Sequence, residues 1–266
     1  ATYTIECMMH DRKALQAGTS HYFGDGFAKA FEITFTDKNN QRVYPHHTSW
    51  GVSTRLIGGI IMTHGDNNGL VLPPKIAPIQ VVIVPVAAHK PGVLEAAASL
   101  QTRLQAAGLR VKLDSSDNSL GWKCAQWEMK GVPLRVEIGP KDLEQGQCCM
   151  VRRSDGEKTF VPLQELEQTA EQQLQAVHDG LYARAKKNLE EHTYVAHSLE
   201  EAKQLQQEKG GFIKTMWCES LECELKMKEE AGMSSRCMPF AQEHLDDVCP
   251  ICGKPAKKMI YWGVAY

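Results

Sequence analysis

Long apolar runs are absent from this 266-residue sequence. No stretch approaches the roughly 18 uninterrupted apolar residues that a membrane-spanning helix needs. The first ten residues also lack the basic and apolar blocks of a secretory signal peptide. A large excess of positive charge is missing too, because the formal net charge is -2. We therefore expect a cytoplasmic protein without a membrane partner, in which any contact with nucleic acid comes from a local patch.

An even set of cysteines is also lacking. The chain has nine cysteines, and several of them, such as Cys7 and Cys124, stand alone. An odd number with isolated members favours a reducing compartment over a disulfide framework. Four of the others occur as two close pairs, which is typical of one metal site.

Two cysteine pairs near the end of the chain predict a structural Zn²⁺ site. Four residues separate the first pair, and a C-P-I-C-G sequence holds the second. Tetrahedral Zn²⁺ needs thiolates that converge from two short turns, and full cysteine ligation leaves no position for water or substrate, so the metal would support folding and not catalysis. Cys237, between the pairs, is an alternative ligand. The expected ligands are Cys218, Cys223, Cys249 and Cys252.

The order of apolar runs and breakers predicts three domains, at residues 1–78, 79–184 and 185–266. Residues 70–78 carry three prolines among apolar residues and make a natural domain exit. A buried strand from Ile79, a helix from Pro91 to Gly108 and a strand at residues 109–114 then form a parallel crossover. Further strands are expected at 132–139 and 147–153, and a long helix at 163–192.

Polar residues near the start of the chain could contact a small ligand. The sequence QAGTSH at 16–21 places an amide, a hydroxyl and an imidazole within one short turn, and residues 49–55 lead into a buried helix at 53–64 that packs closely on a sheet. The FEITF sequence at 31–35 and the turn after it predict a hairpin. Taken alone, such a turn more often only satisfies its own backbone, and an arginine at a helix start is more often a cap.

The sequences QAGTSH, FGDGFAKAFEITF, TSWGVSTRLIG and HGDNNGLVLPPKIAP together resemble the second half of the active-site domain of prolyl-tRNA synthetases of the archaeal and eukaryotic-like form. Residues 51–55 look like motif 3 of this class II family. The resemblance runs from about Thr4 to Tyr266. It implies part of a class II antiparallel-sheet catalytic domain, an α/β mixed-sheet anticodon-binding domain and a small α/β zinc-binding C-terminal domain, in a fold that is α/β and α+β overall.

The same resemblance implies roles for the N-terminal residues. Arg55 would be the catalytic residue that binds ATP phosphate, because arginine keeps its charge beside the negative phosphates. ATP would also contact Gln16 and Thr19. The proline pocket would be lined by His21, Trp50, Gly51 and Ser53.

Local charge and a second resemblance predict an RNA site. Residues 121–153 hold six basic and four acidic residues, whereas residues 163–208 hold four basic and nine acidic ones. Trp122 and Trp127 could stack on bases, although core packing is the simpler expectation for both. The sequence GWKCAQWEMKGVPLRVEIGPKDLE is similar to the family's anticodon-binding domain. The residues that match its contacts to anticodon guanines are Glu128, Arg135, Lys141 and Asp142.

Motifs 1 and 2 of the family, which carry the dimer interface and an arginine for the α-phosphate, do not appear. We therefore expect a C-terminal portion of a proline-tRNA ligase that is inactive alone and homodimeric when full length. The implied ligands and partners are ATP, Mg²⁺, structural Zn²⁺, proline and proline tRNA. The YWGVAY end resembles the family's end, where the last tyrosine folds back toward the active site, but a frayed terminus is the simpler expectation.

Two alternatives stay open. A non-catalytic RNA-binding protein built on an anticodon-binding domain would explain residues 121–142 and leave Gln16 to Arg55 without a role. Another class II synthetase, of the threonyl or histidyl type, would share the anticodon-binding fold. The sequences TSH and TSWGVSTR and the cysteine pairs disfavour this second alternative.

Overall fold

A computed structural model describes all 266 residues of the chain. Their contacts divide the chain into two compact units. Unit 1 joins residues 1–63 with residues 188–266, and unit 2 is residues 64–187. This division groups residues 64–78 with the segment that follows them. The three domains predicted from the sequence, with their two boundaries, stay predictions.

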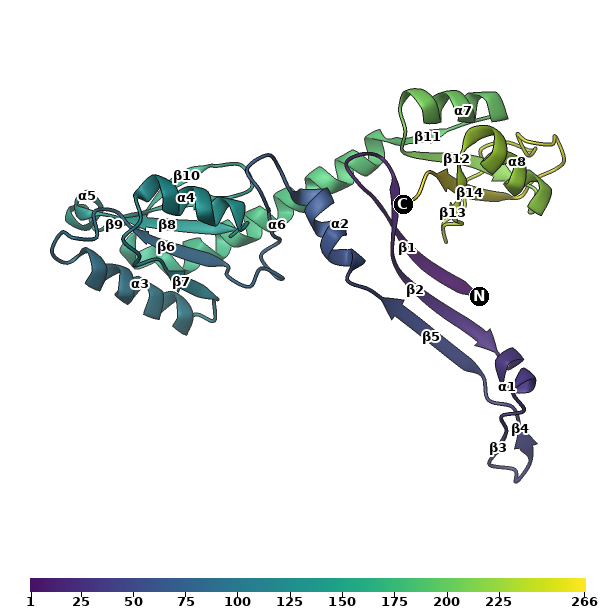
Figure 1. Cartoon of the computed structure of the whole chain (residues 1–266), viewed down its shortest axis with the longest axis horizontal. Helices are drawn as coiled ribbons and strands as arrows, with labels where there is room; N and C mark the ends of the chain where they lie inside the picture. Colours follow the sequence, from purple (N-terminus) through teal and green to yellow (C-terminus); the bar gives the residue numbers. More distant parts are fainter. The chain divides into compact units, whose positions relative to one another are not determined.

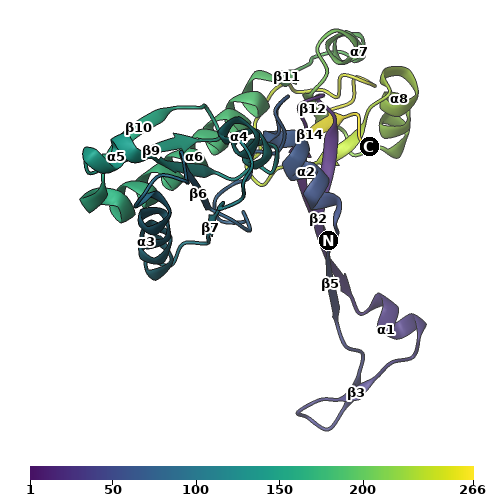
Figure 2. The same ribbon diagram turned by 60° about the vertical axis from the view of Figure 1, so that its left-hand side comes forward.

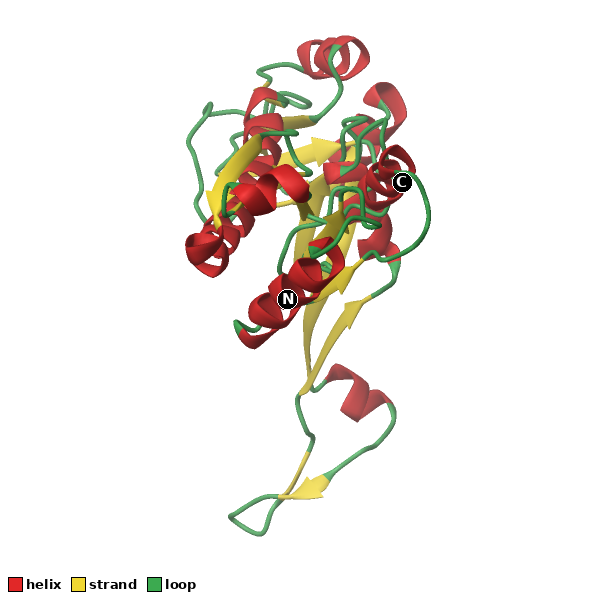
Figure 3. Cartoon of the chain, turned by 90° about the vertical axis from the view of Figure 1, so that its left-hand side faces the viewer, coloured by secondary structure: helices red, strands yellow, loops and turns green.

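The first part of unit 1 is a three-stranded antiparallel sheet in the order β1-β2-β5. Its strands are β1 (Thr2–Met8), β2 (Ala14–Gly24) and β5 (His47–Val52), and helix α2 (Arg55–His64) follows. Helix α1 (Gly26–Ala30) and the hairpin of β3 (Phe35–Thr36) and β4 (Arg42–Val43) connect β2 to β5. They lie beyond the far ends of these strands (Figures 2 and 3). The predicted hairpin is confirmed, although its first strand begins at Phe35 and not at Phe31.

Two expectations for this segment were wrong. The QAGTSH sequence is not a turn but the middle of β2, because both β1 and β5 pair with it. Helix α2 exists, but its side chains are mostly exposed and Gly59 is its one buried residue. A Cβ at Gly59 would lie 3.0 Å from the Leu15 side chain, so the helix meets the sheet closely at this point.

The second part of unit 1 is a four-stranded sheet in the order β11-β12-β14-β13. Its strands are β11 (Thr193–Val195), β12 (Phe212–Trp217), β13 (Ser234–Cys237) and β14 (Lys258–Gly263), with helices α7 (Leu199–Glu208) and α8 (Leu221–Ala231). Ser198 caps α7 by accepting a hydrogen bond from the Glu201 backbone N–H, and the Glu201 carboxylate accepts from the N–H of His197, one residue before the cap. Trp262 and Met227 are completely buried in its core.

The C-terminus does not fray as expected. The Ala14 N–H donates to the Val264 carbonyl (2.7 Å) and the Tyr266 hydroxyl donates to Asp11 (2.5 Å). These bonds tie the chain end to the turn between β1 and β2.

Unit 2 is a mixed five-stranded sheet in the order β10-β9-β8-β6-β7 (Figure 1). The strands are β6 (Val81–Pro85), β7 (Val111–Leu113), β8 (Leu134–Ile138), β9 (Gln147–Arg152) and β10 (Lys158–Pro162). The helices are α3 (Val93–Ala106), α4 (Leu120–Met129), α5 (Pro140–Glu144), a 3-10 turn at Leu163–Glu165 and α6 (Leu166–Glu191). Strand β6 runs parallel to β7 and β8, which confirms the predicted crossover.

Alternation along the strands gives this sheet two different faces. Leu134, Val136 and Ile138 of β8 pack with α3 and α6 in the main core. On the other face, Trp127 of α4 covers Val82 and Val84 of β6. Arg135 and Glu137 of β8 share that second face. No helix of the chain is both long and apolar enough to cross a bilayer.

Candidate functional site

Strand pairing brings together several of the residues predicted to bind ATP and proline. Thr19 lies opposite Gly51, and His21 opposite Ser49, in the β2–β5 register. Directly paired residues project from the same face of a sheet, so Thr19 and His21 share one face. Gly51 leaves that face open, since a Cβ added there would lie 4.0 Å from the Thr19 hydroxyl.

Arg55 lies at the same sheet, at the start of α2. Its guanidinium donates to the Gln16 carbonyl at 3.5 Å, and its backbone N–H donates to the Ser53 hydroxyl. The Gln16 side-chain amide donates to the Thr4 hydroxyl at 3.4 Å. Gln16, Ser53 and Arg55 are therefore neighbours, whereas Trp50 pairs with Ser20 and projects from the opposite face, where it is 77% exposed.

The His21 ring is oriented by two contacts. Its Nδ1 atom lies 3.0 Å from the Thr2 hydroxyl, and the ring stacks on Phe23 with centroids 5.1 Å apart. The sheet thus presents an imidazole and a hydroxyl on one surface, beside a guanidinium. This arrangement can bind a small polar ligand together with an anionic group.

The four cysteines predicted to bind metal form one cluster in unit 1. One ligand atom from each of Cys218, Cys223, Cys249 and Cys252 lies within 4.8 Å of the others. The Cys218 sulfur is 3.5 Å from Cys223 and 3.6 Å from Cys252. Tetrahedral Zn²⁺ with bonds of about 2.3 Å places its sulfurs about 3.8 Å apart, so the cluster fits that ion. Cys237 is not part of it.

Local structure turns these thiols toward one another. Cys223 lies in the first turn of α8, and Gly253, with φ of +72°, allows the backbone to bend after Cys252. Burial raises the pKa of Cys223 and Cys249, whereas the Lys254 backbone N–H lowers the pKa of Cys252 to about 7.

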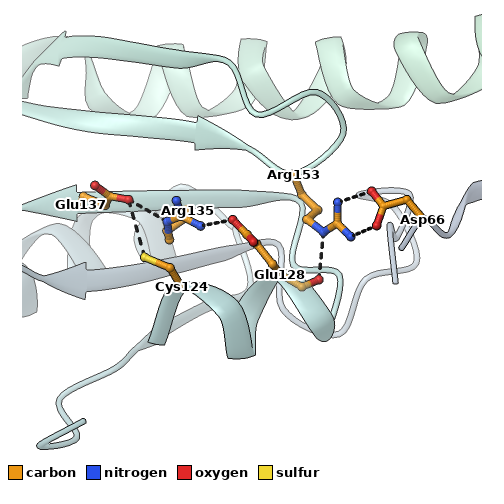
Figure 4. Close-up of polar contacts among 6 residues, drawn as sticks. All are labelled: Asp66, Cys124, Glu128, Arg135, Glu137 and Arg153. Atoms are coloured by element: carbon orange, nitrogen blue, oxygen red, sulfur yellow. Dashed lines mark hydrogen bonds and ion pairs between the residues drawn. The ribbon is translucent and has the colours of Figure 1, made fainter. Parts of the chain in front are cut away.

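Glu128 and Arg135, two of the four residues predicted to read the anticodon, contact one another in unit 2 (Figure 4). The Arg135 guanidinium donates to Glu128 at 3.1 Å and to Glu137 at 2.8 Å. Cys124, one helical turn before Glu128, reaches the same Glu137. Burial alone would lower the pKa of Arg135, but the hydrogen bonds to Glu137 and Glu128 outweigh burial and raise that pKa.

A cavity of about 290 Å³ adjoins this pair. Its lining includes Glu128, Arg135 and Trp127, together with Arg152 and Arg153 of the basic segment 121–153. It also includes residues that the sequence did not point out as an RNA site, namely Asp66, Asn68 and residues 154–156. The HGDNNG sequence was the available signal for Asp66 and Asn68, but the resemblance assigned it to the catalytic domain and not to the RNA site. Polar groups around a concave site of this size can hold one unpaired base.

Lys141 and Asp142 lie in α5, after the opposite end of β8. The Asp142 carboxylate accepts a hydrogen bond from the Gly139 N–H and so caps α5. Lys141 is exposed. These two side chains could contact a base or phosphate other than the one beside Glu128.

The positive patch counted from the sequence is weaker than expected. Lys123 is buried, donates to the Asp114 carbonyl at 3.2 Å and lies 4.0 Å from the Asp114 carboxylate. Trp127 is buried and donates to the same carboxylate at 2.8 Å, which confirms core packing for this tryptophan. Trp122 is half exposed.

Comparison with protein families gives two matches. Residues 80–173 match the anticodon binding domain, and residues 199–266 match the C-terminal region of prolyl-tRNA synthetases. These matches place the chain among the aminoacyl-tRNA synthetases.

Whole-chain relatives narrow this class. The chain is 58% identical to a Bacillus cereus protein named proline--tRNA ligase 2, over all of this chain and 56% of that protein. Proteins named proline--tRNA ligase from Clostridium novyi and Ruminiclostridium cellulolyticum are also 58% identical, with 55% of each covered. The chain belongs to the prolyl-tRNA synthetase family and spans about half the length of the curated relatives it matches.

Proposed function

We propose that this chain is part of a proline-tRNA ligase, which activates proline with ATP and transfers it to proline tRNA. In the first step a carboxylate oxygen of proline attacks the α-phosphorus of ATP and pyrophosphate leaves. In the second step a hydroxyl of the terminal tRNA ribose attacks the adenylate carbonyl and AMP leaves. The names of relatives 58% identical to the chain support this reaction.

One observation carries the proposal: a single sheet holds the residues expected at the two ends of prolyl-adenylate. We assign Gln16, Thr19 and Arg55 to ATP, since Arg55 bonds to the Gln16 carbonyl and Thr19 lies three residues further along the same strand. His21, Gly51 and Ser53 are assigned to proline, whereas Trp50, which was also expected there, projects from the sheet's other face and cannot line the same pocket. Mg²⁺ would accompany ATP as a counter-charge for its phosphates.

Arg55 would stabilise the negative charge of the ATP phosphates while the adenylate forms. Removing one preorganised donor of this kind costs about 10²–10³ in kcat. In the full-length protein, Arg55→Ala should lower proline-dependent pyrophosphate exchange by that factor, and Arg42→Ala in the exposed hairpin should leave it unchanged. An Arg55→Ala protein with wild-type exchange would contradict the assignment. The inactivity predicted for residues 1–266 alone is tested in the same assay.

The four-cysteine cluster would hold one structural Zn²⁺. Bound to four thiolates, the ion would lock the turn before α8 to the turn at Pro250–Gly253. We propose three domains, with boundaries near residues 78 and 184, and cytoplasmic homodimers when the protein is full length. Sedimentation of the full-length protein tests the last point.

Glu128, Arg135, Lys141 and Asp142 would bind the anticodon guanines, because carboxylates accept from the Watson–Crick edge of guanine and cations pair with its acceptors or with phosphate. Binding of the 266-residue chain to a proline tRNA transcript tests this directly. Replacing each anticodon guanine by adenine should weaken binding by roughly 5- to 150-fold. Equal affinity for all transcripts would contradict the RNA site, and discrimination by a full-length protein without exchange activity would favour a non-catalytic RNA-binding protein.

A further inference from the structure

Residues 65–72 form a clasp on the end of α4. The Leu70 N–H donates to the Met129 carbonyl at 3.0 Å, and the Leu72 N–H donates to the Gly131 carbonyl at 3.2 Å. The two backbones approach so closely that a Cβ at Gly69 would lie 2.6 Å from Met129. This contact holds Asp66 in place beside the cavity next to Glu128.

Arg153 links this clasp to α4 (Figure 4). Its two terminal nitrogens donate to the two oxygens of Asp66 at 2.7 and 2.6 Å, and its Nε donates to the backbone carbonyl of Glu128 at 2.9 Å. The Arg153 side chain is only 6% exposed. A guanidinium that is buried and bonded on three sides has no free edge for a base, so Arg153 is suited to hold a neighbour and not to read RNA itself.

The Asp66 carboxylate is held in this ion pair by its charge and its hydrogen bonds. Hydrogen bonds from Arg153 hold its pKa at about 2, so the carboxylate is ionised throughout the neutral range. It also accepts from the Asn68 N–H at 2.9 Å, which fixes the loop around it. The fork between Asp66 and Arg153 is therefore both charged and rigid.

Glu128 is the residue that this arrangement positions. Arg153 fixes its backbone carbonyl, and Arg135 fixes one oxygen of its side chain at 3.1 Å. The other carboxylate oxygen makes no hydrogen bond in the structure, and the side chain is 39% exposed. A fixed carboxylate with one free oxygen at a cavity can accept from the edge of a base.

We infer that Asp66 and Arg153 are positioning residues, which hold Glu128 in the orientation that distinguishes an anticodon guanine from adenine. The inference rests on the anticodon-binding function proposed above. Discrimination between bases depends on directed hydrogen bonds, so a small rotation of α4 at Glu128 would lower it even where the total charge near the RNA stays similar.

The test uses the 266-residue chain and fluorescent proline tRNA transcripts with guanine or adenine at each anticodon position. Asp66→Asn and Arg153→Lys each remove the bidentate fork while keeping side-chain size close to the original. Asp155→Asn is the matched control, because Asp155 lines the same cavity and pairs with Arg152 at 2.9 Å without contacting Glu128. The readout is the ratio of the two dissociation constants, which does not depend on the folded fraction of the sample.

We expect Asp66→Asn and Arg153→Lys to lower the guanine-to-adenine ratio at one anticodon position by about threefold or more, out of the roughly 5- to 150-fold that a well-placed contact gives. Asp155→Asn should keep the wild-type ratio. Unchanged ratios in both fork variants, or an equal loss in Asp155→Asn, would overturn the positioning role. A wild-type chain that does not discriminate at all would instead remove the anticodon assignment itself.

Discussion

The buried pair of Lys123 and Asp114 offers the sharpest test of how unit 2 is held together. Both side chains are almost fully buried. The Asp114 carboxylate accepts from Trp127, from the Ser116 backbone and from the Ser116 hydroxyl at 2.8, 3.1 and 2.6 Å. Burial opposes its ionisation, but these hydrogen bonds outweigh burial and lower its pKa. The change Asp114→Asn removes the charge and replaces one acceptor oxygen by an NH2 group, so either Trp127 or Ser116 also loses its acceptor.

The expected cost follows from what remains. Lys123 would stay buried without its counter-charge, and removing one partner of a buried pair costs about 3–5 kcal/mol. The free energy of unfolding of a domain of this size is about 5–15 kcal/mol in total. The melting temperature of unit 2 should therefore fall by on the order of 10–20 °C. In the double variant Asp114→Asn with Lys123→Met no buried charge remains, so this variant should be more stable than the single variant, although one donor of Trp127 or Ser116 still lacks its acceptor.

Urea and thermal unfolding, followed by tryptophan fluorescence with Trp127 as the probe, measure both variants. A melting temperature of Asp114→Asn within 2 °C of wild type, taken as about the effect of 0.5 kcal/mol, would contradict a stabilising ion pair. A double variant no more stable than the single one would do the same. RNA binding adds a second readout. The double variant should leave the salt dependence of tRNA affinity unchanged, whereas Lys141→Met should lower its slope by about 0.7 if Lys141 meets phosphate.

Three further outcomes are expected. Chelation of zinc, or Cys223→Ser, should unfold the region around α8 and shift the fluorescence emission of buried Trp262, whereas Cys237→Ser outside the cluster should not. Mass spectrometry should find one metal ion per chain. An unshifted emission after removal of the metal would refute a structural ion. Gly131→Ala should destabilise unit 2 more than Gly146→Ala. Both glycines have positive φ, but only at Gly131 would the new Cβ lie 2.6 Å from Leu70. Equal melting temperatures would show that the backbone of residues 65–72 moves to make room for the Cβ. The pKa of Asp66 is lowered to about 2 in the folded chain, so its contribution to stability is complete above the unfolded value of about 3.9 and is lost as pH falls toward 2. In Asp66→Asn the free energy of unfolding should therefore depend less on pH in this window. The same pH dependence in the variant and the wild type would argue against the fork.

Sequence patterns predicted unit 2 well because its elements are signalled locally. A run of β-branched residues from Ile79 and a helix bounded by Pro91 and Gly108 need no distant information, and the structure confirms both with β6 and α3. The two cysteine pairs are also a local signal, since their spacing predicted which thiols converge.

Long-range contacts were not predictable in the same way. Glycine, serine and threonine in QAGTSH favour a turn, yet pairing with β1 and β5 makes this segment a strand. Counting charges treated Lys123 as a surface cation, although Asp114 draws it into the core. The apolar composition of α2 predicted a buried helix, but burial depends on distant partners, and most of its side chains are exposed.

The candidate site shows the same limit. Glu128 and Arg135 were found through resemblance, and their ion pair fits a shared role. The contact between Asp66 and Arg153 joins residues 87 positions apart, and no local pattern marks it. Only a structure could place that fork against the Glu128 carbonyl.

Unit 1 is discontinuous in the chain, and this has a consequence during synthesis on the ribosome. Met8 and Ala14 pack against Phe212, with Tyr261 and Ala265 alongside, and these partners emerge only after unit 2 has been made. At about 5–20 residues per second, the segment from His64 to Lys187 takes on the order of 6–25 seconds to translate. The apolar side chains of Met8 and Ala14 therefore stay uncovered by these partners until residues 212–265 have been made.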